Sequence, residues 1–181
     1  FLIYVLSAIL LFNNITPDIK LIKEYQRNFY LIGMRNIWQA QPECVEFSKN
    51  QIYKPKKKSC NFNNVEFKTI LNFDELGRTS NHPKSIDNNG IAILGDSFAM
   101  GWGVNDNQTF SYLLEKKIKR PVYNLGVSGY GTIRELQRLK DANLLNKVDT
   151  IIIQYCYNDY GENIGYKKTS SVIAKKKYEI V

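Results

Sequence analysis

Three short apolar segments, recurring at similar intervals, constrain the fold of this chain more than any other feature. They lie at residues 91–94, 122–125 and 150–155. The stretches that separate them carry apolar residues at helical spacing. A strand–helix–strand–helix–strand order is typical of a parallel sheet with right-handed crossovers. The sequence therefore predicts an α/β domain with a flavodoxin-like parallel sheet over residues 90–181.

The two intervening segments have the periodicity of amphipathic helices. The first places four apolar residues on one helical face: Phe110, Leu113, Leu114 and Ile118. The second is predicted to turn four apolar residues toward the core: Ile133, Leu136, Leu139 and Leu144. It opens with Thr132 and Glu135, which have the spacing of a capping box at a helix N-terminus.

The region before the sheet, residues 42–89, has a different sequence pattern. Its short runs are broken by Lys-Pro, Asn-Asn and Gly. Alternation such as Val65 and Phe67 against Glu66 and Lys68 indicates small strands in hairpins. We therefore expect a small β-rich segment ahead of the parallel sheet.

Two of the three cysteines belong to this β-rich segment. Cys44 and Cys60 flank a hairpin-like stretch, whereas Cys156 follows an apolar strand of the later domain. We predict a Cys44–Cys60 disulfide, which would go with an extracytoplasmic location. The alternative is a pair of free thiols in a reducing compartment. Cys156 is interpreted as a small core residue, because a cysteine nucleophile would need a histidine partner.

The chain opens with the apolar run FLIYVLSAILLF, which has no polar face. The run is shorter than the ~20 residues that span a bilayer. We interpret residues 1–16 as a partial transmembrane anchor, followed by a juxtamembrane helix or connector over residues 17–41. A buried core helix or a signal-peptide core is the alternative. Lys20, Lys23 and Arg27 would favour a cytoplasmic flank, so charge alone leaves the orientation open.

The formal net charge of +8 raises the question of an anionic partner. The lysines are spread over several parts of the chain, and no nucleic-acid-binding signature accompanies them. We interpret them as solvated faces and expect no nucleic-acid partner. No Cys/His cluster has zinc spacing, so no metal and no cofactor are expected.

Polar and glycine-rich motifs follow all three predicted strands. They read GDSF at residues 95–98, NLGVSGYG at 124–131 and YCYND at 155–159. In open α/β sheets, ligands bind at the carboxyl ends of the strands. A serine at a strand-to-helix turn exposes its hydroxyl near unpaired backbone N–H groups. The three motifs together therefore predict a serine-based site at this edge.

In this order, the motifs resemble the SGNH (GDSL) hydrolase family, and the resemblance covers residues 91–166. The resemblance implies that Ser97 is the nucleophile. It further implies an oxyanion hole formed by the Ser97 N–H, the Gly129 N–H and the Asn158 side-chain amide. Gly129 is chosen among the loop glycines because it follows Ser128. Asp96 is interpreted as a structural carboxylate.

The fourth block of the family, Asp-x-x-His after the serine, is absent from the sequence. The single histidine, His82, precedes Ser97 and lacks this context. We therefore expect the catalytic histidine and aspartate to lie beyond Val181. On this interpretation residues 90–181 are a C-terminally incomplete SGNH hydrolase domain, which would be inactive and prone to aggregate as given.

The resemblance implies a membrane-anchored esterase or lipase-like enzyme on the extracytoplasmic, periplasmic side. Ser97 would form an acyl-enzyme with an acyl-ester substrate, such as an acylated glycan or lipid. Two alternatives stay open: an O-acyltransferase that modifies a cell-envelope glycan, and a non-catalytic SGNH-like binding domain. Finding or failing to find Asp-x-x-His downstream would separate the enzymes from the binding domain.

Overall fold

The computed structural model describes residues 3, 5–6, 20–79 and 89–167. The chain divides into two compact units, Phe1–Asn36 and Ile37–Val181. The first unit contains helix α2 (Lys20–Gly33), within the range expected for a juxtamembrane helix. Among the described residues, no helix combines the length and hydrophobicity that crossing a bilayer requires. The expected anchor over residues 1–16 lies almost wholly outside the described residues.

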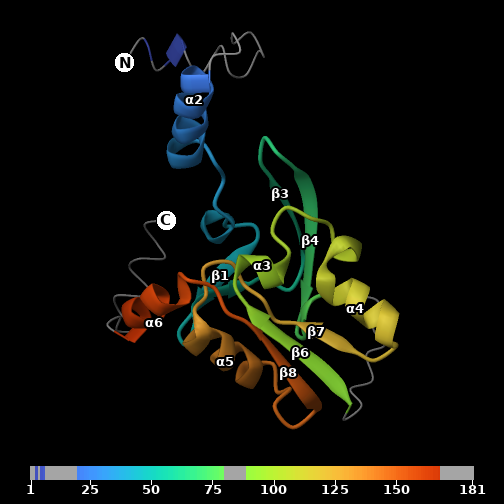
Figure 1. The fold of residues 1–181 in the computed structure, drawn as a ribbon. Coiled ribbons are helices and arrows are strands. Elements are labelled where there is room, and N and C mark those ends of the chain that lie inside the picture. The colour runs from blue at the N-terminus through green and yellow to red at the C-terminus, as the bar shows by residue number, and fades with distance from the viewer. Residues whose placement is uncertain (1–2, 4, 7–19, 80–88, 168–181) are drawn as a thin grey trace. The chain divides into compact units, whose positions relative to one another are not determined.

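The second unit is built on a mixed sheet of six strands in the order β3-β4-β5-β7-β6-β8 (Figure 1). The strands are β3 (Ser59–Asn63), β4 (Lys68–Asp74), β5 (Gly77–Arg78), β6 (Gly90–Gly95), β7 (Val122–Asn124) and β8 (Val148–Gln154). The α/β class is confirmed, and β6 pairs in parallel with both β7 and β8, as predicted.

The parallel strands predicted over residues 90–181 do not form a sheet of their own but one half of a mixed sheet. Strands β3, β4 and β5 come from the β-rich segment and extend the same sheet through antiparallel pairs. A separate antiparallel hairpin forms from β1 (Val45–Ser48) and β2 (Ile52–Pro55). Alternation along the chain identifies a strand but does not specify its partner, because pairing depends on which sheet edge is available.

Two helices cover the parallel half of the sheet on opposite faces. Ile91 and Ile93 of β6 pack with residues of α4 (Phe110–Ile118). Ala92 and Leu94, which alternate with them, pack with Leu139 of α5 (Thr132–Asp141). Successive side chains of a strand point to opposite faces, so the two crossover helices sandwich β6.

The predicted inner faces of these helices are correct only in part. In α5, Arg134, Glu135 and Arg138 are buried, whereas Leu136 is exposed. In α4, Leu114 and Ile118 pack on the sheet, but Phe110 and Leu113 are exposed. The periodicity of apolar residues located both helices and misplaced their inward faces.

The predicted capping box at the start of α5 is not formed. Gly131 is the N-cap, and it makes no side-chain cap. Thr132 is therefore already inside the helix, and its hydroxyl lies 3.5 Å from Asp159 Oδ2. Glu135 is fully buried and has no hydrogen-bond partner on either carboxyl oxygen.

The predicted disulfide is confirmed, since Cys44 and Cys60 are bonded with their Cα atoms 5.3 Å apart. Cys44 directly precedes β1, and Cys60 lies on β3 at the outer end of the sheet. The bridge therefore ties the β1–β2 hairpin to the sheet. Both cysteines belong to a core cluster with Trp38.

One arginine joins the antiparallel half of the sheet to the loop after α3 (Ser97–Met100). Arg78 is almost fully buried and is the residue of β5 that pairs with Asn124 of β7. Its guanidinium donates to Asp106 at 2.6 Å and to the carbonyls of Met100, Gly101 and Val104 at 2.6–2.7 Å. These bonds fix residues 100–106 against the sheet.

Candidate active site

The three sequence motifs meet at one edge of the sheet. Strand β6 lies between β7 and β8 and runs parallel to both. The residues that follow these strands therefore emerge on the same side, at the carboxyl ends. This is the edge at which ligands bind in open α/β sheets.

Ser97 begins the one-turn helix α3 directly after β6. The turn depends on Gly95, whose φ of +153° and close neighbours exclude a side chain: a Cβ there would lie 2.6 Å from the Ala99 Cβ. Asp96 caps the helix, because its carboxylate accepts from the Phe98 N–H at 2.9 Å. This supports the structural role predicted for Asp96. Ser97 itself is half-buried.

Two amide side chains hold α3 between the neighbouring strands. Gln154, the last residue of β8, accepts a hydrogen bond from the Ala99 N–H at 3.1 Å. Asn124, the last residue of β7, donates to the Ala99 carbonyl and to the Ser111 hydroxyl, each at 2.9 Å. These bonds position the serine turn from both sides. The sequence analysis missed both residues, although each is a polar residue at the end of an apolar run.

The loop after β7 bonds first to the end of β6 and then to Tyr53 of the β-rich segment. Val127 donates its N–H to the Gly95 carbonyl at 3.0 Å. Gly129 has a φ of +75°, and a Cβ there would lie 2.7 Å from the Tyr53 hydroxyl oxygen. Both the backbone conformation and the lack of space therefore require glycine at this position.

Two side chains fix the peptides on either side of Gly129. The Tyr53 hydroxyl donates to the Ser128 carbonyl at 2.6 Å, and Arg134 donates to the Gly129 carbonyl. In a trans peptide the N–H points opposite to the preceding carbonyl. The Gly129 N–H is thus directed away from Tyr53. Burial raises the pKa of Tyr53 to about 12, so this hydroxyl remains a donor at neutral pH.

Asn158 closes the turn between β8 and α6 (Asp159–Lys167). Its carbonyl accepts the Glu162 N–H at 3.0 Å, which anchors the backbone, and its side chain is half-buried. Ser97, Gly129 and Asn158 thus follow three adjacent strands at one edge. That the three approach within hydrogen-bonding distance of one another stays a prediction.

The groups expected to stabilise an oxyanion are free within the described part of the chain. No described residue accepts a hydrogen bond from the Ser97 N–H, the Gly129 N–H or the Asn158 side-chain amide. The Ser97 hydroxyl likewise makes no hydrogen bond to a described residue. Buried or half-buried donors normally find a partner, so these groups are available to a ligand.

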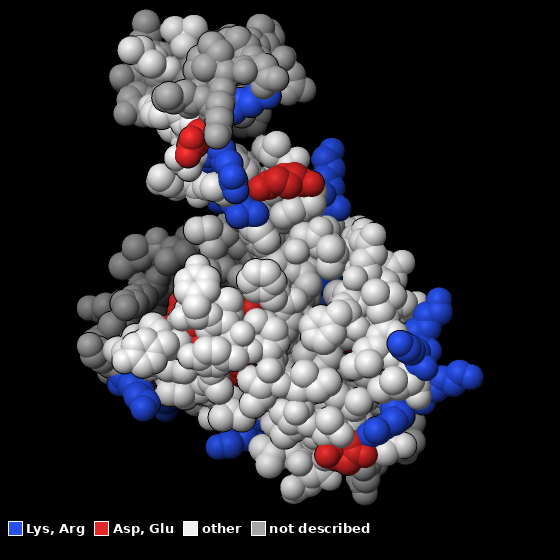
Figure 2. All heavy atoms as spheres, viewed as in Figure 1, with Lys and Arg blue, Asp and Glu red and all other residues white. Residues whose placement is uncertain are grey.

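A pocket of about 310 Å³ opens beside the serine. It is lined by Ser97, Phe98, Gly101, Trp102, Val104, Gln108, Thr109 and Phe110. Trp102, five residues after Ser97, thus borders the same pocket as the serine. Phe98 is 71% exposed at its rim. Figure 2 shows few charged side chains over α3 and its neighbouring loops, with Lys and Arg mostly at the margin of this face.

Buried carboxyl groups lie beneath the site. Glu135 is 0% exposed, and its pKa rises to about 8 because burial disfavours the charged form and the carboxyls of Asp159 and Asp96 add repulsion. Burial also raises the pKa of Asp159. Burial therefore favours the protonated form of Glu135. The sequence analysis assigned Glu135 to a helix cap, whereas the side chain is buried and makes no hydrogen bond to a described residue.

The described residues contain no histidine to serve as a base, and His82 lies outside them. Within the same residues, no cluster of three or more His, Cys, Asp or Glu side chains could hold a metal ion. Cys156 is a free, half-buried thiol.

Comparison of the chain with protein-family models, with curated proteins and with solved structures finds no significant match.

Proposed function

We propose that this chain carries the nucleophile and oxyanion hole of an SGNH-type serine ester hydrolase. The observation that supports this most directly is the set of unpartnered groups at one sheet edge: the Ser97 hydroxyl and N–H, the Gly129 N–H and the Asn158 amide. Acyl transfer needs a nucleophile together with donors for the developing oxyanion. The resemblance of the three motifs to the SGNH family adds support.

In the proposed reaction, the Ser97 oxygen attacks the ester carbonyl as a base removes its proton. The carbonyl oxygen becomes an oxyanion that accepts hydrogen bonds from Ser97, Gly129 and Asn158. Collapse of this intermediate expels the alcohol, which takes the proton, and leaves an acyl group on Ser97. Water then attacks the acyl-enzyme and releases the acid. The family resemblance implies a histidine as base.

The pocket beside Ser97 suits an acyl group. Its lining includes Phe98, Trp102, Val104 and Phe110, which offer apolar surface to a hydrocarbon chain. Ligand pockets are mostly apolar with few polar groups that fix orientation. Here Ser97, Gln108 and Thr109 are the polar side chains of the lining. We therefore propose an acyl ester as substrate.

The Cys44–Cys60 disulfide supports an extracytoplasmic location, because disulfides persist in oxidising compartments. The proposal keeps the membrane attachment expected from the apolar run at the start of the chain. An O-acyltransferase would use the same serine and donors, with a sugar hydroxyl replacing water in the second step.

Hydrolysis of p-nitrophenyl acetate by the protein in its natural full length tests the proposal. Ser97→Ala should abolish hydrolysis, whereas Ser59→Ala, at an exposed site on β3, should leave it unchanged. Unchanged activity in Ser97→Ala would place the nucleophile elsewhere. His82→Ala should also retain activity, and loss of hydrolysis in that variant would identify His82 as the base.

A further inference from the structure

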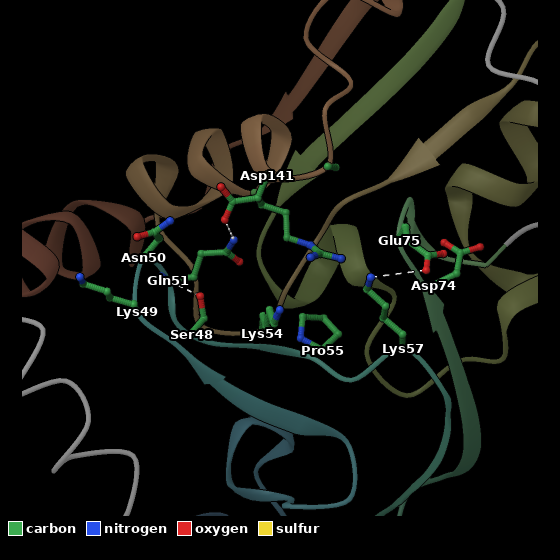
Figure 3. Close-up of a pocket in the computed structure, with 12 residues that line it drawn as sticks. Ser48, Lys49, Asn50, Gln51, Lys54, Pro55, Lys57, Asp74, Glu75 and Asp141 are labelled. Carbon is green, nitrogen blue, oxygen red and sulfur yellow. Dashed lines mark hydrogen bonds and ion pairs between the residues drawn. The ribbon is translucent and has the colours of Figure 1, made fainter.

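A second pocket, of about 440 Å³, lies among the β1–β2 hairpin, the β4–β5 turn and the last turn of α5. It is lined by Ser48, Lys49, Asn50, Gln51, Lys54, Pro55, Lys57, Asp74, Glu75, Arg138, Asp141 and Ala142. In Figure 3, Gln51 of the hairpin turn faces Asp141, and Lys57, just after β2, faces Glu75. It shares no lining residue with the pocket beside Ser97.

Arg138 is the unusual member of this lining. Its side chain is 7% exposed, and its Nε is buried with no hydrogen-bond partner. No described residue forms a hydrogen bond or an ion pair with the guanidinium. Burying a cation without a partner is costly, and burial indeed lowers the pKa of Arg138. A buried, unpaired guanidinium on a pocket wall is a binding group for an anion.

The carboxylates of the pocket already have partners of their own. Asp141 accepts from the Gln51 and Gln137 amides, and Glu75 pairs with Lys57 at 3.4 Å. Asp74 accepts the Leu76 N–H at 2.8 Å. Asp141 and Asp74 still act on the Arg138 guanidinium through their charge, but neither forms an ion pair or a hydrogen bond with it.

The charge of the pocket sets the charge of its ligand. Four cationic side chains (Lys49, Lys54, Lys57 and Arg138) face three carboxylates (Asp74, Glu75 and Asp141), which leaves one positive charge in excess. One carboxylate would balance this excess. A phosphate dianion would leave the pocket with a net negative charge, and the three acidic side chains would repel it more strongly than they repel a carboxylate.

We propose that this pocket binds a carboxylated sugar, with the sugar carboxylate paired to Arg138. The planar guanidinium matches a carboxylate through two parallel hydrogen bonds. The rim offers amide and carboxylate groups, from Asn50 and Asp74 among others, which suit sugar hydroxyls. The volume lies within the range of small-molecule sites. The site is separate from Ser97, so it does not depend on the proposed ester chemistry.

Calorimetric titration of the 181-residue chain with D-glucuronate tests this site. We expect saturable binding at one site per chain. D-glucose, acetate and inorganic phosphate should each bind at least about tenfold more weakly, because each lacks either the carboxylate or the hydroxylated ring, a difference of about 1.4 kcal/mol.

Two variants locate the site. Arg138→Gln should weaken glucuronate binding by at least about tenfold, in keeping with the loss of a charge-assisted hydrogen bond. Lys49→Glu, at an exposed position of the hairpin turn, reverses the excess charge and should weaken binding without risk to the core. Arg120→Gln serves as the matched control, since Arg120 pairs with Asp149 at the surface. Circular dichroism checks that each variant is folded.

Three results would overturn the proposal. The first is equal glucuronate affinity in the folded Arg138→Gln variant and the parent, and the second is unchanged affinity in Lys49→Glu. Equal affinity for acetate or phosphate would reduce the site to a simple anion site and refute sugar recognition. All readouts are binding constants, so failure of the ester-hydrolase proposal would leave them unaffected.

Discussion

Asn158 presents its side-chain amide at the sheet edge without a hydrogen-bond partner among the described residues. An amide suits an oxyanion hole because it donates without bringing a charge. Asn158→Ala should lower kcat for p-nitrophenyl acetate by about 10²–10³, the typical effect of losing one such donor. KM should change little, because the bond forms mainly in the transition state. Steady-state kinetics on the full-length protein provide the measurement.

A matched control is Asn61→Ala, at an exposed site on β3, which should keep the parent kcat. A fall in affinity with unchanged kcat in Asn158→Ala would instead assign the amide to substrate binding.

The raised pKa of Glu135 makes the free energy of unfolding depend on pH. Its pKa is about 8 in the folded chain and near 4.5 when exposed. Between these values the folded state holds a proton that the unfolded state has released, so rising pH favours unfolding. The parent should lose on the order of 3 kcal/mol of unfolding free energy between pH 5 and 8.5, at about 1.36 kcal/mol per pKa unit.

Denaturant titrations at the two pH values test this linkage. Glu135→Gln keeps the shape and removes the ionisation, so its stability should vary much less over the same range. Glu43→Gln, at an exposed position, should follow the parent. A parallel pH dependence in Glu135→Gln would show that other groups govern it.

At the scale of elements, the disulfide holds the β1–β2 hairpin to β3. Thiol titration of denatured, non-reduced protein should detect one free thiol, Cys156, and reduction should raise the count to all three cysteines. A bridge that closes a loop of this length contributes about 3 kcal/mol in the chain-entropy model. Reduction should therefore lower the unfolding free energy by about that amount. Three free thiols before reduction would exclude the bridge in the protein as purified.

The sequence was sufficient to place the elements that carry the candidate site. Each apolar run became a parallel strand, and Ser97, Gly129 and Asn158 follow adjacent strands. The inner face of α5 could not be predicted in the same way. Arg134 is buried there because it donates to Gly129 and pairs with Glu162, residues that lie outside its own helix. Tertiary partners of this kind leave no periodic signal.

At the scale of the whole molecule, the sheet ends at β8, which pairs with β6 alone among the described strands. Ile151 and Ile153 are 44% and 48% exposed on this edge strand. Exposed apolar edge strands promote association between chains. The 181-residue chain should therefore self-associate as its concentration rises, in agreement with the aggregation expected from the sequence.

Sedimentation velocity over a range of concentrations measures this association. Ile153→Lys should reduce it, because a charge on an edge strand opposes edge-to-edge pairing. Val65→Lys, at another exposed apolar position, is the control and should associate like the parent. Equal association in all three proteins would locate the contact away from β8.

Local opening of the molecule is expected to begin at the junction between β5 and β7. Arg78 and Asn124 form the single register pair described there, whereas β6 and β8 pair along their length. Amide protons of β6 should exchange with solvent only on global unfolding, and those of β5 through smaller and faster openings. Because Arg78 also holds residues 100–106, each such opening would release the wall of the pocket beside Ser97. Hydrogen exchange at β5 should therefore report the movement of that wall.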